Sequence, residues 1–354
     1  MFDLALSVLV KLAVGFVGGV IAWQLGLPMP FLTGALFITA AVALSRSNTP
    51  KTATSFPRII RQSFTAIIGV MIGQNFSPEL FGILDTLWLS LGAILIFVIL
   101  SHGIGFVIYR YLGRYDRETA IFASVPGGLI EAITFAEQSG AKVNIVTVQH
   151  FARVILVITI VPLLFFAWTG EVVGSAAGVE MAGASYSLWD IALTVVVAGV
   201  GMVVGKRLKL PAAILIGPLI LSAGLQLSGV LPAHAPTWLL TAAQLVVGVG
   251  LGAEFQGIGR AQLVRSLGLG LVAMVAYLLL ALGFAAALVV VVDIPFSALF
   301  LSFAPGGVTE MSLVALSLNV GPIIVATHHV FRISVTVVMM TFLVKRLGLT
   351  SSKT

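Results

Sequence analysis

The sequence carries one unusual motif twice. The first copy begins VPGGLIE at residue 125, and the second begins APGGVTE at residue 304. Each copy is followed by a His-x-x-Arg motif at the same distance, so the two stretches align without a gap. The matched polar and backbone-breaking residues are Pro126/Pro305, Gly127/Gly306, Gly128/Gly307, Glu131/Glu310, His150/His329 and Arg153/Arg332. Self-similarity of this kind predicts that one structural unit occurs twice in the chain.

The repeat extends towards the N-terminus of each copy. Leu27, Pro28 and Gly34 match Leu210, Pro211 and Gly217, and the pair Gly69 and Gly73 matches Gly248 and Gly252. We therefore predict a first membrane repeat at 1–170, a Gly/Ala/Ser-rich linker at 171–187 and a second membrane repeat at 188–354. The glycine pairs have the small-xxx-small spacing that lets helices pack closely, and we expect them to pack helices within one chain.

The composition excludes a water-soluble fold. Of the 354 residues 59% are hydrophobic and 9% are charged, whereas soluble domains carry about 25% charged residues. Each half contains six apolar segments, and about 20 apolar residues are needed to cross a bilayer as a helix. The segments lie near 5–24, 29–45, 62–77, 86–109, 118–137 and 143–168, and near 188–205, 211–230, 237–255, 266–291, 297–317 and 321–344. We predict an all-α polytopic membrane protein.

The fifth apolar segment of each half cannot be one regular helix. Pro-Gly-Gly stands in its middle, and proline removes a helical hydrogen bond while glycine adds backbone freedom. Such a break is tolerated at membrane depth only where protein or a wet cavity covers it. We expect a broken helix or a re-entrant hairpin at 118–137 and at 297–317.

The basic residues predict the topology. If the fifth segment returns to its starting side, every lysine and arginine except Lys11, Arg153 and Arg332 falls on the side of the N-terminus. If it crosses, several basic residues move to the opposite side, which the positive-inside rule disfavours. Five crossings per half is an odd number, so the second repeat is predicted to be inverted, with both termini cytoplasmic. The same parity would follow if another segment failed to cross.

Inverted repeats with paired broken segments are typical of secondary transporters, whose site lies near the midplane between the repeats. Broken helices expose free N–H groups that attract anions, and their carbonyl ends can hold sodium. We therefore take the matched Pro, Gly, Glu, His and Arg residues as the candidate substrate and ion site.

Glu131 and Glu310 have two interpretations. A carboxylate inside a membrane is costly when charged, which suggests a proton or cation site or part of a substrate cage. Alternatively, each caps the half-helix that starts after the break.

Arg153 and Arg332 also have two interpretations. Each could form a fixed ion pair with the glutamate of its own repeat, or each could bind an anionic substrate. His150 and His329 lie on the same helical face as these arginines. They could relay protons, bind the broken backbone or simply pack in the interior.

The sequence offers no metal or cofactor site. The chain has no cysteine, and the adjacent His328 and His329 point about 100° apart on a helix, which makes them a poor metal pair. Walker, Rossmann, HExxH and GxSxG motifs are absent from the sequence. We predict neither an enzyme nor an ATP-driven pump, and no nucleic-acid partner.

The twin P-G-G-x-x-E and H-x-x-R motifs resemble the duplicated AbrB family of bacterial inner-membrane proteins. The resemblance covers nearly the whole chain and implies a bacterial inner (cytoplasmic) membrane location. That family carries two labels, ammonia monooxygenase and regulator. At the level of fold, the Pro-Gly-Gly break is also similar to that of the cation:proton antiporters and anion transporters. Their sodium-coordinating polar cluster is replaced here by Glu131 and Glu310, so a proton is the expected coupling ion.

Three functions follow as hypotheses. The first is a proton-coupled secondary transporter of a small anionic organic solute, working by alternating access at the crossing of two broken helices. The second is a membrane-embedded sensor or regulator of gene expression that keeps a transporter scaffold. The third is a membrane monooxygenase, for which the five histidines supply few ligands. The expected partners are the lipid bilayer, a solute with its coupling ion, and a second copy in a homodimer.

Overall fold

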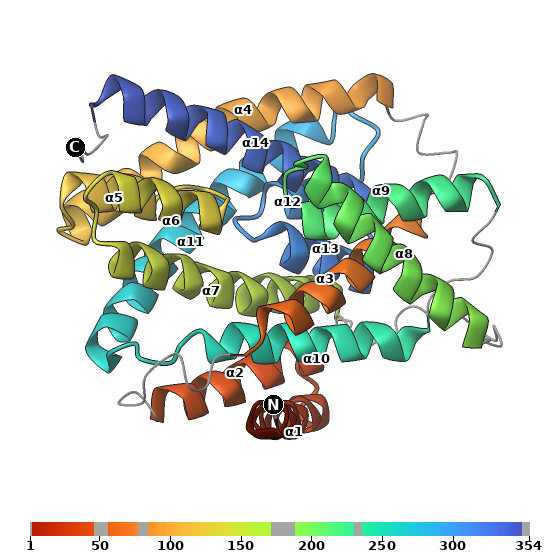
Figure 1. The fold of residues 1–354 in the computed structure, drawn as a ribbon. Coiled ribbons are helices and arrows are strands. Elements are labelled where there is room, and N and C mark those ends of the chain that lie inside the picture. The colour runs from red at the N-terminus through yellow and green to blue at the C-terminus, as the bar shows by residue number, and fades with distance from the viewer. Residues whose placement is uncertain (1, 46–55, 77–83, 171–187, 230–235, 349–354) are drawn as a thin grey trace. The chain divides into compact units, whose positions relative to one another are not determined.

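The computed structural model describes residues 2–45, 56–76, 84–170, 188–229 and 236–348. Helices joined by short connections make up this part of the chain, and no strand occurs among the described residues (Figure 1). The predicted linker at 171–187 lies outside the described residues.

The helices of the first half follow the predicted apolar segments closely. The fourth helix ends in a π-helical turn, η3, and the fifth segment is two short helices instead of one. The elements are α1 (Phe2–Gln24), α2 (Pro30–Ser45), α3 (Arg58–Gly73), α4 (Leu84–Val107), η3 (Ile108–Leu112), α5 (Arg117–Ala123), α6 (Leu129–Gln138) and α7 (Val143–Thr169).

The second half repeats this order. Its elements are α8 (Leu188–Arg207), α9 (Ala213–Leu227), α10 (Thr237–Ala253), α11 (Arg260–Leu288), α12 (Phe296–Phe303), α13 (Val308–Ser317) and α14 (Pro322–Arg346). In the described part of the chain, six helical stretches are long and apolar enough to span a membrane, namely those of α1, α4 with η3, α7, α8, α11 and α14. The all-α membrane fold is therefore confirmed. Whether the shorter apolar helices α2, α9 and α10 also cross stays a prediction.

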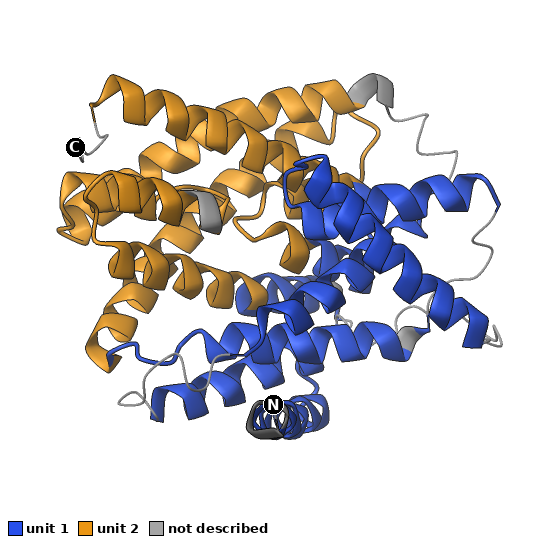
Figure 2. Ribbon diagram, in the orientation of Figure 1, with its two compact units in different colours: residues 1–80, 159–259, 312–323 blue, residues 81–158, 260–311, 324–354 orange. Residues whose placement is uncertain are grey.

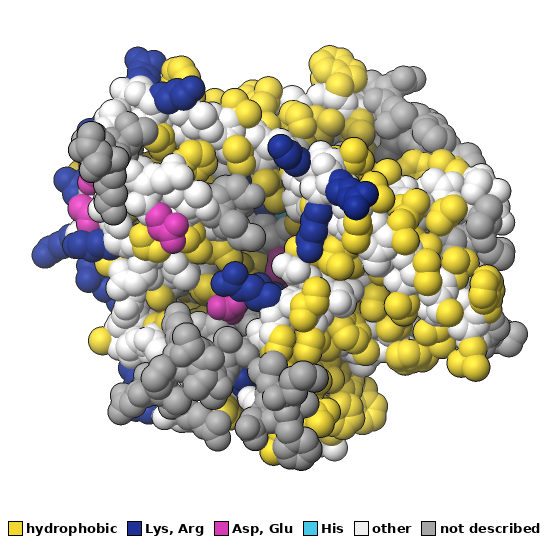
Figure 3. Space-filling view, in the orientation of Figure 1, with side chains coloured by type: hydrophobic (Ala, Val, Ile, Leu, Met, Phe, Trp, Pro, Cys, Tyr) yellow, Lys and Arg dark blue, Asp and Glu magenta, His cyan; other side chains and the backbone are white. Residues whose placement is uncertain are grey.

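Large apolar side chains cover the outside of the long helices. On α8, Val195, Val196, Val200 and Val203 are all exposed, and Figure 3 shows the surface over this helix covered by hydrophobic side chains. Soluble proteins rarely expose a continuous apolar surface along a whole helix, whereas a helix that faces lipid requires one. The surface thus fits a helix bundle whose solvent is the bilayer.

The chain divides into two compact units (Figure 2). Unit 1 comprises residues 1–80, 159–259 and 312–323, and unit 2 comprises 81–158, 260–311 and 324–354. Each unit takes matching segments from both halves of the sequence. Unit 2 contains both Pro-Gly-Gly motifs and both His-x-x-Arg motifs.

Within unit 1 the two halves pack on each other reciprocally. A Cβ atom added to Gly69 would lie 2.4 Å from the carbonyl oxygen of Leu215, and one added to Gly248 would lie 2.5 Å from that of Leu32. The same pair of contacts recurs one helical turn further along. There Gly73 packs against the carbonyl oxygen of Leu219, and Gly252 packs against that of Leu36. The glycines thus allow α3 to pack on α9, and α10 on α2, within one chain. Such reciprocity is expected of two copies related by a two-fold axis, and the direction of that axis relative to a membrane stays a prediction.

Both Pro-Gly-Gly motifs interrupt their helices, as predicted. Helix α5 ends at Ala123 and α6 begins at Leu129, while α12 ends at Phe303 and α13 begins at Val308. Gly128 precedes α6 with φ +65°, in the left-handed region that side chains disfavour. The breaks leave the last carbonyl groups of α5 and α12 without helical partners, and the site forms around these carbonyls.

Candidate functional site

The two matched histidines bind the broken backbone. Nε2 of His150 lies 2.9 Å from the carbonyl oxygen of Phe122, and Nε2 of His329 lies 2.9 Å from that of Leu301. In both halves the bond spans 28 residues. Each histidine therefore ties the helix after the break, α7 or α14, to the half-helix before it.

The two matched arginines bind the carbonyl groups next to the breaks. Nη1 of Arg153 donates to the carbonyl of Val125 at 2.5 Å, and Nη1 of Arg332 donates to that of Ala304 at 2.6 Å. A cation is favourable at a helix C-terminus, where free carbonyl groups carry partial negative charge. The His-x-x-Arg motif thus holds the broken segment of its own half through two neighbouring carbonyls.

Arg332 makes two further contacts. Its Nη2 donates to the carbonyl of Gly306 at 2.5 Å and contacts Nδ1 of His329 at 2.7 Å. A guanidinium has no acceptor, so Nδ1 of His329 must accept this hydrogen bond. The ring proton of His329 therefore sits on Nε2 and is donated to the carbonyl of Leu301. This pairing fixes His329 as a neutral imidazole of one tautomer.

The two breaks meet at Arg332. A Cβ atom on Gly127 would lie 3.7 Å from Nε of Arg332 and 4.0 Å from Oγ1 of Thr336. Arg332 belongs to the second half and holds Gly306, so one side chain lies against both Pro-Gly-Gly motifs. These are ordinary van der Waals distances, so the space beside Gly127 admits a methyl group without a clash.

In the two His-x-x-Arg motifs and at Thr336, several buried polar atoms have no hydrogen-bond partner among the described residues. They are Nδ1 of His150, Nε of Arg153, Nε of Arg332 and Oγ1 of Thr336. Arg332 and Thr336 are each 1% exposed, and both face Gly127. Buried polar groups are nearly always paired in folded proteins, so these orphan groups call for a reason. The two Nε atoms are donors, whereas Nδ1 of His150 is an acceptor, because Nε2 of that ring donates to the carbonyl of Phe122.

Glu310 occupies a capping position. It is the third residue of α13, and its Oε2 lies so close to Gly307 that a Cβ there would be 2.1 Å away. In a capping box the third helical residue reaches back to the residue that precedes the helix. This geometry fits the interpretation of Glu310 as a helix cap. The backbone of Glu131 lies in α6, but its side chain lies outside the described part of the chain.

Charge at the site is mainly positive in the described residues. The guanidinium groups of Arg153 and Arg332 are near enough to repel each other, and Glu310 interacts electrostatically with Arg153 of the other half. Arg332 donates to the carbonyls of Ala304 and Gly306 and to Nδ1 of His329. Burying a cation costs several kcal/mol, and an anion bound beside it would offset part of that cost.

His328 serves a different contact from His329. Its Nδ1 lies 2.8 Å from the carbonyl of Ile324 and its Nε2 lies 2.8 Å from Oγ of Ser90. The described residues contain no group of three or more His, Asp or Glu side chains placed to hold a metal ion. The two adjacent histidines thus point to separate partners, as the helical geometry predicted.

Sequence reasoning missed Thr336. The repeat places Val157 at the matching position of the first half, so the search for matched polar residues passed over it. Its signal was helical spacing: Thr336 follows Arg332 by one turn and shares its face. Gln149, which precedes His150 in the sequence, is fully buried, and its Nε2 donates to the carbonyl of Ser266 in α11 at 3.0 Å.

Comparison with known proteins places this architecture in a family. The family model described as "Transition state regulatory protein AbrB" matches residues 47–348. The chain is similar to the "Putative regulator AbrB" of Escherichia coli (strain K12), with 27% identity over 86% of this chain and 84% of that protein. It is also similar to the "Uncharacterized protein YhjN" of Bacillus subtilis (strain 168), with 26% identity over 93% of this chain and 90% of that protein. The chain therefore belongs to the AbrB family.

Proposed function

We propose that this protein is a secondary transporter of a small organic anion, and not an enzyme. The observation that carries the proposal is the position of Arg332, which holds one helix break and presents an unpartnered Nε to the other. Two broken helices meeting at buried polar groups is the arrangement that secondary transporters use for their substrate site.

An anion suits the site better than a cation or a neutral solute. The unpartnered Nε atoms of Arg153 and Arg332 can only donate hydrogen bonds, and their charge is positive. Nε of Arg332 and Oγ1 of Thr336 face Gly127 together, so they can bind one carboxylate from neighbouring points. Arginine binds carboxylates well because its planar fork of donors matches their geometry.

A proton is the coupling ion that fits the residues best. Glu310 lies at the break beside Arg153, and a carboxylate there can release its proton when the anion leaves and take one up again. The neutral state of His329 leaves the carboxylates as the titrating groups of the motif. Alternating access would expose unit 2, which carries both breaks, to each side in turn. We place the protein in a bacterial inner membrane with both termini cytoplasmic.

Uptake into proteoliposomes tests the proposal. The purified chain would be reconstituted with an inward proton gradient and offered a panel of labelled mono- and dicarboxylates, with an amine and a sugar as controls. We expect uptake of at least one carboxylate, and its loss in Arg332→Gln. Arg346→Gln is the matched control, since Arg346 ends the same helix and stacks on Phe342 at the surface. No carboxylate flux, or equal flux in Arg332→Gln, would contradict the proposal.

The names of the family and of its Escherichia coli relative suggest regulation as a second candidate. A sensor could use the same anion site without transport. In that case the carboxylate would raise the melting temperature of the wild-type protein, Arg332→Gln would lose this effect, and no flux would be measured. This outcome separates the two functions.

A further inference from the structure

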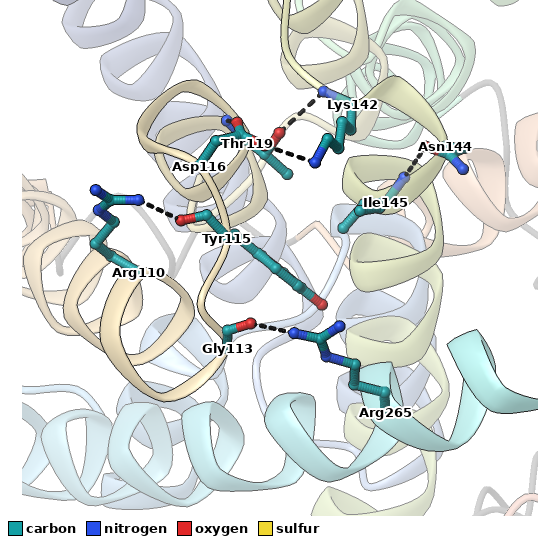
Figure 4. A network of polar contacts seen from close by, with 9 residues as sticks. All are labelled: Arg110, Gly113, Tyr115, Asp116, Thr119, Lys142, Asn144, Ile145 and Arg265. Carbon is teal, nitrogen blue, oxygen red and sulfur yellow. Dashed lines mark hydrogen bonds and ion pairs between the residues drawn. The ribbon is translucent and has the colours of Figure 1, made fainter.

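Unit 2 contains a cavity whose lining residues lie outside the helix breaks. Its volume is about 340 Å³, and its lining includes Tyr115, Asn144, Ile145, Gln262, Arg265 and Ser266. Figure 4 shows Arg265 and Tyr115 converging here from α11 and from the loop before α5, beside the start of α7. Neither the repeat nor the proposed transport site accounts for this cavity.

The cavity holds one fixed positive charge. Arg265 donates from Nη2 to the carbonyl of Gly113 at 2.5 Å, and its guanidinium carbon lies 5.4 Å from the centre of the Tyr115 ring. These contacts use one of its five N–H donors and hold its plane in place. The nearby carboxylate of Asp116 is engaged elsewhere, 3.4 Å from Nζ of Lys142. The described residues that line the cavity include no acidic side chain.

Two long helices begin at the cavity. Asn144 and Ile145 belong to the first turn of α7, and Gln262 belongs to the first turn of α11. Nε2 of Gln262 donates to the carbonyl of Asn144 at 3.4 Å, so the two helix starts are linked. The N-terminus of a helix carries partial positive charge and free N–H groups, which favour an anion.

Ser266 supplies independent evidence for a ligand. Its side chain is 1% exposed and lines the cavity, yet its hydroxyl has no hydrogen-bond partner among the described residues. It lies near the hydroxyl of Tyr115, but outside hydrogen-bonding geometry. The Tyr115 hydroxyl instead donates to Oε1 of Gln149 at 3.2 Å. A buried hydroxyl without a partner among the described residues therefore lies beside an arginine and two helix starts, and these groups together favour an anion.

We propose that this cavity binds an organic anion. The carboxylate or phosphate group lies at Arg265 and Ser266, and a small apolar body packs against Tyr115 and Ile145. The anionic group can belong to a free metabolite or to the headgroup of a lipid. Binding here does not require the transport proposed above, because none of these side chains lies at the two helix breaks.

Cysteine protection tests this site. The chain has no cysteine, so Ala261→Cys, which lines the cavity, gives one thiol to follow by its rate of maleimide labelling. Val264→Cys is the matched control, because Val264 is 70% exposed on the same helix and does not line the cavity. The probe for a free anion is benzoate in detergent. The probe for a lipid is a phosphatidylglycerol nanodisc, compared with a phosphatidylcholine nanodisc.

We expect benzoate at ten times its dissociation constant to slow labelling of the Ala261→Cys variant roughly tenfold. At that concentration only about one protein molecule in ten has an empty cavity and a reactive thiol. Labelling of the Val264→Cys variant should not change. Adding Arg265→Gln should abolish the protection, while adding Arg260→Gln, in the first turn of the same helix, should leave it. Protection by phosphatidylglycerol alone would assign the site to a lipid headgroup. Protection by neither probe, or protection that survives Arg265→Gln, would overturn the proposal. None of these outcomes depends on measuring transport.

Discussion

A Cβ atom added to Gly127 would lie 3.7 Å from Nε of Arg332, although the two residues belong to different halves of the chain. The same guanidinium binds the carbonyl of Gly306, which is the counterpart of Gly127. One arginine therefore binds the second break and lies beside the first, where its Nε has no hydrogen-bond partner among the described residues.

Gly127 and Gly128 should respond differently to substitution by alanine. Gly127→Ala places a methyl group at 3.7 Å from Nε of Arg332, a distance that packing tolerates, so the melting temperature should hardly change. The methyl group should nevertheless weaken anion uptake by occupying the approach to Arg332 and Thr336. Gly128→Ala should instead destabilise the fold by roughly 1–2 kcal/mol, because Gly128 has φ +65°.

Thermal unfolding in detergent and carboxylate uptake would be measured for both variants. A large loss of stability in Gly127→Ala, or full uptake by it, would contradict the placement of the site.

His329 should contribute more to stability than its counterpart His150. His329→Ala removes two buried hydrogen bonds, to Leu301 and to Arg332, and should cost about 2–4 kcal/mol. His150→Ala removes one such bond, since Nδ1 of His150 has no partner among the described residues. Its cost should be smaller by about 1 kcal/mol. Denaturant unfolding of the two variants gives this difference directly, and equal losses would show that the Arg332 contact contributes nothing.

Glu310→Gln should separate capping from proton coupling. Glutamine can occupy the capping position as glutamate does, so the melting temperature should be retained. Glutamine does not titrate, so uptake driven by a proton gradient should be lost while exchange of solute across the membrane continues. The measurement is uptake with and without the gradient. If proton-driven uptake survives, Glu310 is a cap alone.

Asp116 should make the start of α5 sensitive to acid. Burial raises the pKa of this carboxyl. Hydrogen bonds from Thr119 and the Lys142 ammonium together lower the pKa by more, so the net pKa lies below the ordinary value of 3.8. A carboxyl whose pKa is lower in the folded state stabilises the fold above its unfolded pKa, and this stabilisation is lost as the pH falls through its folded pKa. Acidification below about pH 4 should therefore destabilise the wild type more than Asp116→Asn, which keeps a capping side chain but cannot titrate.

Asp116→Ala is the control for the cap itself, and should cost about 1 kcal/mol at neutral pH. Identical acid profiles for the wild type and Asp116→Asn would contradict the assignment.

Much of the fold was predictable because the repeat and the breaks are coded locally. The apolar segments gave the helices within a few residues, and Pro126 and Pro305 marked both interruptions. The pairing of side chains was not predictable in this way. Whether Arg332 meets Glu310 or the carbonyls of Ala304 and Gly306 depends on where α14 lies against the break, which is a tertiary property.

The compact units were also beyond the sequence pattern. Each unit combines segments of both halves of the chain. Reciprocal contacts such as Gly69 with Leu215 and Gly248 with Leu32 form only when both copies are present. A local pattern does not contain that information.

The sidedness of Arg58 and Arg260 tests the inverted duplication most directly. Both residues are exposed, at the starts of α3 and α11, and the chain supplies a background without cysteine. Arg58→Cys and Arg260→Cys would each be labelled with a membrane-impermeant maleimide, in intact cells and in inside-out vesicles. The account predicts that both react only in inside-out vesicles, on the cytoplasmic face. Labelling of the two positions from opposite faces would contradict it.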